Sequence, residues 1–174
     1  MKITTFFFVL ICAVAISCKS GTKKTTDEQQ PARQFGISEV WRTDTLLLTP
    51  ESVIYDKKRD VFYVSNLNFE PRKKDGNGFI SKIDLDGKIV NLRWIEGLSS
   101  PKGMAIVGDT LFTADVDEVV AMDINDGSII RKIPIEGAKM LNDITSDNEG
   151  NLYISDSDAN LIHFIRQRKD VGLV

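Results

Sequence analysis

The sequence contains few of the side chains that carry nucleophilic or zinc chemistry. Its 174 residues include one histidine and two cysteines. The histidine, His163, alternates with Ile162 and Phe164 in a strand-like run, and no second histidine or nearby cysteine accompanies it. A catalytic triad or a structural zinc site needs such partners. We therefore expect His163 to lie at the surface or on an edge strand, outside any catalytic centre.

The sequence also has no excess of basic residues. Its formal net charge is −3, whereas a surface that binds nucleic acid is usually strongly basic. We therefore expect no nucleic-acid partner. Phosphate-binding loops, nucleophile elbows and helical periodicity are absent as well. Charged residues make up 27% and hydrophobic residues 42% of the chain, as in a globular protein, and the length allows one domain.

One long hydrophobic run occurs, near the N-terminus. It extends from Phe6 to Ile16, after the positive Lys2, and is too short to span a bilayer. The run ends just before Cys18, in a pattern that resembles the bacterial lipoprotein cleavage box. We expect residues 1–17 to be a lipoprotein signal peptide and Cys18 to carry the lipid, which places the protein at the bacterial cell envelope. A plain secretory signal is the alternative, because Ala15 replaces the usual leucine.

The segment that follows, residues 18–34, is rich in Lys, Thr and Gln and has almost no apolar side chains. Such a composition cannot bury enough surface to fold, so a flexible tether between the membrane and a domain at 35–174 is expected. Val40 to Thr49 then reads as a strand. It is either a lead-in strand or the strand that completes the last repeat of a closed ring.

The rest of the chain repeats itself. Residues 51–66, 102–115 and 142–156 each consist of a strand-like run, a polar turn and a second run that ends on a polar residue. A second hairpin follows the first two copies, and a shorter run follows the third. Repeats of about 40 residues with four strands each are typical of β-propeller blades. The sequence predicts an all-β fold, a β-propeller of four-stranded antiparallel blades. The expected blades are 50–98, 100–138 and 139–174.

Three blades do not close a ring, because propellers have four to eight. We expect the sequence to be the N-terminal part of a longer, six-bladed protein; the alternative is a half-propeller that dimerises. The first copy carries an insertion at about 70–78, between its second and third strands. Insertions in a repeat often lie on the binding face. The alternative is a long solvated hairpin.

Polar residues occupy the two strand ends that meet at the top of a propeller, near its axis. The starts of the inner strands are Glu51, Lys102 and Asn142, and the ends of the second strands are Asn66, Asp115 and Asp156. Mixed polar groups at one mouth suit an oxygen-ligand metal site or a small-molecule pocket. We predict Glu51 and Asn142 as metal ligands and the other four as ligand-binding residues. For the two aspartates the alternative is a turn role, in which they accept backbone amides of the next loop.

These motifs resemble a known family. The segment ESVIYDKKRDVFYVSN (51–66) is similar to the first blade of the senescence marker protein/gluconolactonase-like (LRE-like) propellers. The resemblance implies a six-bladed β-propeller in which Glu51 is the metal-binding glutamate. It also places Asn142 in the metal and substrate pocket, and YISDSDANLIHFI (153–165) is similar to the NHL repeat. Ser52 and Val53 depart from the family's Gly-Pro, and its later ligands, an Asn and a catalytic Asp, are absent here.

Two hypotheses for function follow. The first is an envelope propeller, lipid-anchored to a membrane, that binds a small ligand or a protein partner on its top face without catalysis. The second is a metal-dependent sugar-lactone hydrolase, in which Ca²⁺ or Zn²⁺ polarises the ester carbonyl. The residues favour the first, because the acid/base and half of the ligands are lacking. In this chain we expect no tight metal binding, since Lys102 faces the same mouth.

Overall fold

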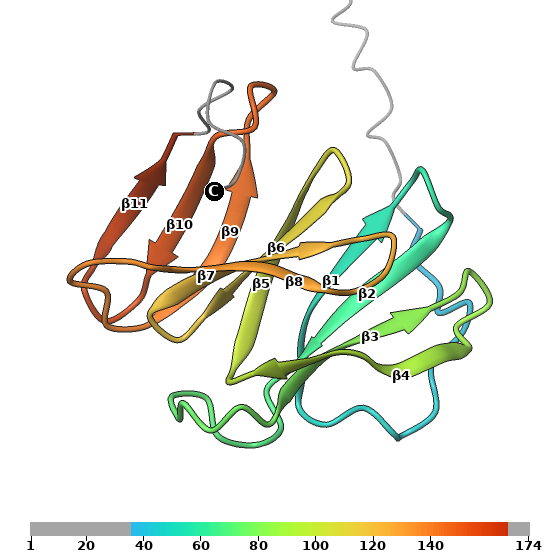
Figure 1. Ribbon diagram of the computed structural model, residues 1–174. Coiled ribbons are helices and arrows are strands. Elements are labelled where there is room, and N and C mark those ends of the chain that lie inside the picture. Colours follow the sequence, from blue (N-terminus) through green and yellow to red (C-terminus); the bar gives the residue numbers. More distant parts are fainter. Residues whose placement is uncertain (1–35, 167–174) are drawn as a thin grey trace, which may run out of the picture. The chain divides into compact units, whose positions relative to one another are not determined.

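The computed structural model describes residues 36–166, and all of its strands lie in the compact unit that begins at Glu39. The described residues form three antiparallel sheets and no helix (Figure 1). The first sheet comprises β1 (Pro50–Asp56), β2 (Val61–Asn66), β3 (Gly78–Ile83) and β4 (Ile89–Leu98). The second comprises β5 (Pro101–Val107), β6 (Thr110–Asp115), β7 (Glu118–Asp123) and β8 (Ile129–Pro134). The third comprises β9 (Leu141–Ser146), β10 (Leu152–Asp156) and β11 (Leu161–Ile165).

The predicted all-β class is confirmed. The strands follow each other in chain order within each sheet, as in a meander, and each sheet falls within one of the expected repeats. In the described part of the chain, no helix is long and apolar enough to cross a membrane. The third sheet has three strands in that range, and the place expected for its fourth strand, 171–174, lies outside the described residues.

The register is the same in all three sheets. The first strand pairs with the second through Val53 and Val64, Met104 and Thr113, and Ile144 and Ile154. Each inner strand also has an irregularity just before this pair, where the ladder shifts. Such bulges bend a strand and redirect its side chains, and they are frequent beside functional sites. Glu51, Lys102 and Asn142 all lie in this irregular stretch.

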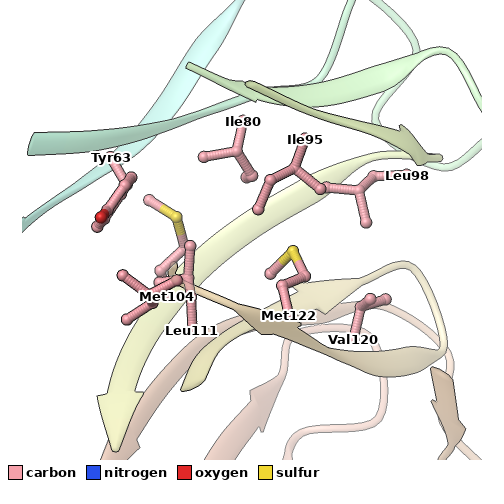
Figure 2. Close-up of a cluster of buried hydrophobic side chains, with 9 residues drawn as sticks. Tyr63, Ile80, Ile95, Leu98, Met104, Leu111, Val120 and Met122 are labelled. Carbon is pink, nitrogen blue, oxygen red and sulfur yellow. The ribbon is translucent and has the colours of Figure 1, made fainter. Parts of the chain in front are cut away.

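Two hydrophobic cores join the sheets. The core between the first and second sheets includes Tyr63, Ile80, Met104 and Leu111, all buried (Figure 2). Tyr63 also stacks on the Trp94 ring, with 4.8 Å between centroids. The members of the core between the second and third sheets include Ala105, Phe112, Val119, Leu141, Ile144 and Ile154. Neighbouring sheets therefore pack face to face, as the alternation of apolar residues predicts.

The predicted strand at Val40 to Thr49 is wrong. The structure gives this segment no strand hydrogen bonds; it runs as an irregular stretch with a turn. Trp41 packs edge-on against Phe62, with ring centroids 6.0 Å apart. The segment's end is tied to the β2–β3 loop by a hydrogen bond from the Leu67 amide to the Thr49 carbonyl (3.1 Å). An apolar, β-branched run becomes a strand only where a sheet edge pairs with it, and within residues 36–166 none does.

Candidate functional site

The first strands of the three sheets lie side by side, with β5 between β1 and β9. The approach of β5 to β9 is very close at Gly103. A Cβ atom built there would lie 2.6 Å from the Asp143 Cα and 2.8 Å from the Ile144 nitrogen. Only glycine permits this contact. The starts of these strands therefore gather at one end of the sheets, and Lys102 is on the middle one.

Lys102 is buried, with 3% of its surface exposed. Its Nζ donates a hydrogen bond to the Ser100 carbonyl oxygen at 3.1 Å. Among the described residues no carboxylate lies within ion-pair distance of it. Burial lowers the pKa of Lys102 below its ordinary value and Arg72 adds to this effect, whereas the Asp115 and Glu51 carboxylates oppose it. An ammonium group that is buried without an ion pair is costly, and such groups are concentrated at functional sites.

Ser100 lies beside this lysine and is fully buried. Its amide donates to the Asp115 Oδ1 at 2.5 Å. Its hydroxyl has no hydrogen-bond partner within the described part of the chain. A buried hydroxyl without a partner loses the free energy of its hydrogen bonds to water. Ser100 and Lys102 thus place two incompletely satisfied polar groups at the start of β5.

The predicted metal ligands, Glu51 and Asn142, are not brought into contact with each other. Glu51 is exposed; partial desolvation raises its pKa, Lys102 lowers it, and Asp143 raises it again. Asn142 donates instead to the Ser157 hydroxyl at 3.1 Å. Asp143 is therefore the β9 residue that acts electrostatically on Glu51. Sequence reasoning missed it because the close approach of Asp143 to Gly103 of β5 depends on the irregular pairing of the folded strand.

No group of three or more His, Cys, Asp or Glu side chains in residues 36–166 is arranged to hold a metal ion. Glu51 and Asp143 are two carboxylates on the strands that flank β5 at this end of the sheets, and the Lys102 charge acts on Glu51. Carboxylates suit a hard cation such as Ca²⁺, but a nearby ammonium repels it. The metal ligation by Glu51 and Asn142 stays a prediction.

The three residues that end the second strands share one structural role. Asp115 accepts the amides of Ser99 (2.8 Å) and Ser100, which precede β5. Asp156 accepts the amides of Lys139 (2.8 Å) and Met140 (3.0 Å), which precede β9.

In the first sheet, the Asn66 amide oxygen accepts the Leu48 amide at 3.0 Å, just before β1. All three side chains are buried, with at most 2% exposed. Each therefore fastens the chain segment that enters its sheet. The predicted turn role placed the amides in the following loop; here Asp156 accepts one such amide, that of Ala159, at 3.0 Å.

The β2–β3 loop (residues 67–77), which contains the insertion, reaches the loops of both other sheets. Arg72 forms an ion pair with Asp158 in the β10–β11 loop. Lys74 Nζ lies 2.7 Å from Asp117 Oδ1 in the β6–β7 loop. Arg72 is also near enough to Lys102 to influence its pKa. This loop, green in Figure 1, thus extends from the first sheet over the end at which the inner strands begin.

A groove of about 420 Å³ lies along the same three strands, nearer their other ends. Its walls combine apolar side chains such as Ile54, Met104 and Ile144 with the polar Asp56, Lys57 and Ser146. Sequence reasoning did not predict this groove. The alternation along the inner strands gave no signal for it, because the groove depends on how far apart neighbouring sheets lie.

Comparison with known proteins identifies the fold. No protein-family model matches the sequence, and no curated protein matches it. A chain in the crystal structure of a nidogen/laminin complex aligns with 24% identity and a TM-score of 0.54, over 68% of this chain and 43% of its own. A chain of the Kuenenia stuttgartiensis hydrazine synthase aligns with 15% identity and a TM-score of 0.54, over 70% of this chain and 46% of its own.

The fold is that of a β-propeller. The three sheets correspond to part of such a ring, and the chain spans less than half the length of the two structures named above. A gluconolactonase from Xanthomonas campestris also aligns, with 19% identity and a TM-score of 0.48, over 68% of this chain and 48% of its own. At these identities the likeness concerns the fold alone.

Proposed function

We propose that this protein is an envelope-anchored β-propeller lipoprotein that binds a small ligand or a protein partner on the face where β1, β5 and β9 begin. In the chain as given, this binding is not coupled to catalysis. The observation that carries the proposal is the buried Lys102 ammonium, which has a carbonyl hydrogen bond but no ion pair among the described residues. A ligand oxygen would complete its environment.

The neighbouring groups indicate the chemistry of that ligand. The Lys102 ammonium favours a carbonyl or carboxylate oxygen, and the Ser100 hydroxyl can donate to or accept from the same molecule. Glu51 and Asp143 on the flanking strands suit hydroxyl groups or a bound cation. A polyhydroxylated acid or its lactone combines these features. Because a lactone is among these ligands, lactone hydrolysis is the alternative function.

The test is binding of gluconate and of glucono-δ-lactone, measured by titration calorimetry. Lys102→Met removes the charge but keeps the apolar stem, and Lys88→Met at an exposed turn position is the matched control. We expect binding to be lost in Lys102→Met and kept in Lys88→Met. Equal affinity in all three proteins would contradict the proposal. Hydrolysis of the lactone above its spontaneous rate, with Ca²⁺ or Zn²⁺ present, would favour the enzymatic alternative.

The anchor is a separate part of the proposal. It rests on the hydrophobic run that ends before Cys18, which lies outside the described residues. Replacement of Cys18 by alanine should abolish the incorporation of labelled palmitate in bacteria and leave the precursor uncleaved or the protein free of the membrane. Equal incorporation without Cys18 would contradict it.

A further inference from the structure

The repeat brings chemically similar residues to equivalent positions, and their exposure differs in one sheet. Tyr63, Phe112 and Tyr153 occupy the same register position on the second strand of each sheet. Tyr63 is 0% and Phe112 7% exposed, because the next sheet covers them. Tyr153 is 39% exposed. The third sheet thus presents to solvent an aromatic ring that the other two sheets bury.

The third strands show the same difference. Ile80, Val119 and Ile162 pair with equivalent residues of the second strand. Ile80 and Val119 are completely buried, whereas Ile162 is 62% exposed. Phe164 packs on Tyr153, with 5.1 Å between ring centroids, and remains half exposed. Tyr153, Ile162 and Phe164 form what we call the outer face of the third sheet.

The first sheet has the complementary exposed surface. Val53, Met104 and Ile144 are equivalent in register. Met104 and Ile144 contact the preceding sheet and are 6% and 4% exposed, whereas Val53 is 64% exposed. Tyr55, two residues further along β1, is also exposed and packs on Phe62, with 5.2 Å between ring centroids. Val53 and Tyr55 are the exposed part of what we call the outer face of the first sheet; beside them, Trp41 packs on Phe62.

We propose that the outer face of the third sheet binds the outer face of the first sheet of a second copy of this chain. The two faces carry positions equivalent to the two sides of the contact that already occurs twice within the chain. A second copy can repeat that contact along β1, beside the Phe62 ring on which Trp41 packs. The contact is head-to-tail, and such contacts close into rings when the rotation per subunit permits. Two copies of the described part of the chain supply six sheets, and propellers close with four to eight. The proposal does not depend on the ligand site at Lys102.

The experiment measures the mass of the full chain by size exclusion with light scattering, in a mild non-ionic detergent and under reducing conditions. Ile162→Glu places a charge on the third-sheet face, and Val53→Glu places one on the first-sheet face. Leu85→Glu, at an exposed position in the β3–β4 turn, is the matched control. Circular dichroism and thermal unfolding establish that each variant is folded.

We expect the wild-type chain and Leu85→Glu to be dimers. Each face variant should dissociate, with affinity reduced about 100-fold or more, because a charge would be buried in an apolar contact. A mixture of Ile162→Glu and Val53→Glu should form a one-to-one dimer, since one unaltered face of each kind remains. A wild-type monomer at tens of micromolar would overturn the proposal. So would a dimer that Ile162→Glu abolishes and Val53→Glu leaves intact, because the contact would then join two third sheets.

Discussion

Replacement of Asp156 by asparagine should destabilise the protein, although the two side chains have nearly the same shape. In the wild-type chain, Oδ1 of Asp156 accepts the amides of Met140 and Ala159, both at 3.0 Å. Oδ2 accepts the Lys139 amide at 2.8 Å and lies 3.3 Å from His163 Nε2. An asparagine can keep the first two bonds through its oxygen. Its NH₂ group, however, would face the Lys139 amide, donor against donor.

The cost follows from that single lost bond. A hydrogen bond to a charged acceptor contributes about 1.5–3 kcal/mol, and the amide left without an acceptor adds to the loss. We therefore expect the free energy of unfolding to fall by about 2–3 kcal/mol at pH 7. Asn66 occupies the same position in the first sheet without penalty. There its NH₂ donates to the Val64 carbonyl and the Ser81 hydroxyl, both at 3.0 Å, and only its oxygen accepts an amide.

The difference in the free energy of unfolding between wild type and Asp156→Asn should become smaller at low pH. Burial alone would raise the pKa of Asp156, but the hydrogen bonds from the three amides and His163 hold it below its ordinary value. An aspartate in the unfolded chain has a pKa of about 3.9. The carboxylate's contribution is fully present above that value, and it is lost as the pH falls through it toward the lower folded-state pKa. The gap in the free energy of unfolding between wild type and variant should narrow below about pH 4.

Denaturant unfolding followed by circular dichroism, at pH 7 and pH 3.5, measures both quantities. Asp86→Asn, at an exposed turn position, is the control and should change the stability by less than about 0.5 kcal/mol. A variant as stable as wild type at pH 7 would refute the assignment of Asp156 as the acceptor that fastens β9. A gap that persists unchanged at pH 3.5 would refute its origin in the carboxylate charge.

Three further predictions concern the starts of the inner strands. Gly103→Ala should destabilise the protein by about 1–3 kcal/mol, because its Cβ would collide with the β9 backbone, whereas Gly36→Ala, with open space around it, should not; thermal unfolding compares them. The double variant Arg72→Gln/Lys74→Gln removes the ion pairs that hold the β2–β3 loop to the other two sheets. It should increase severalfold the rate at which an amine reagent labels Lys102. Lys73→Gln is the control and should leave the rate unchanged, because the ion pair of Lys73 with Asp75 lies inside the loop. Calorimetry should detect little Ca²⁺ binding by this chain. In a version with further repeats, Ca²⁺ binding should appear, and the Ca²⁺ affinity should fall on Glu51→Gln. An unchanged Ca²⁺ affinity in that variant would assign Glu51 a structural role.

The periodic part of the fold could be predicted from the sequence. The bounds of β2, Val61–Asn66, follow from a short apolar run that begins after a charged turn and ends at a polar residue. The strands of the second sheet follow from a turn at Gly108 and another at Gly127, both with positive φ. These signals are local, because period-two alternation and turn residues depend on neighbours in the chain. Where the partner of a segment is distant, as for Val40 to Thr49, propensity alone gave a wrong prediction.

The site was less predictable for the same reason. The Arg72–Asp158 ion pair joins residues far apart in sequence, and nothing in either local sequence indicates the other. The close approach of Asp143 to Gly103, while Asn142 donates to Ser157, is likewise a property of the folded strand. The burial of Lys102 could be suspected only from its place in the repeat. Its neighbour Ser100 carried no signal, because an unpartnered hydroxyl cannot be recognised without the structure.

The repeats make it possible to separate structural from functional demands within one chain. At the end of the second strand, all three sheets carry a side chain with a carbonyl-type oxygen, namely Asn66, Asp115 and Asp156. Each uses it to accept an amide from the segment that enters its sheet. One structural role therefore constrains that position to similar chemistry.

The start of the first strand behaves differently, since an acid, a base and an amide occupy equivalent places at Glu51, Lys102 and Asn142. No common backbone partner explains their identities. The Glu51 carboxylate is exposed, the Lys102 ammonium is buried against a carbonyl, and Asn142 donates to Ser157 in the β10–β11 loop. The backbone at these three positions is equivalent in the three sheets, but the side chains differ. The backbone alone therefore does not determine which residue occupies the position. This contrast directs the search for function to the start of β5, where the Lys102 ammonium is buried without an ion pair among the described residues.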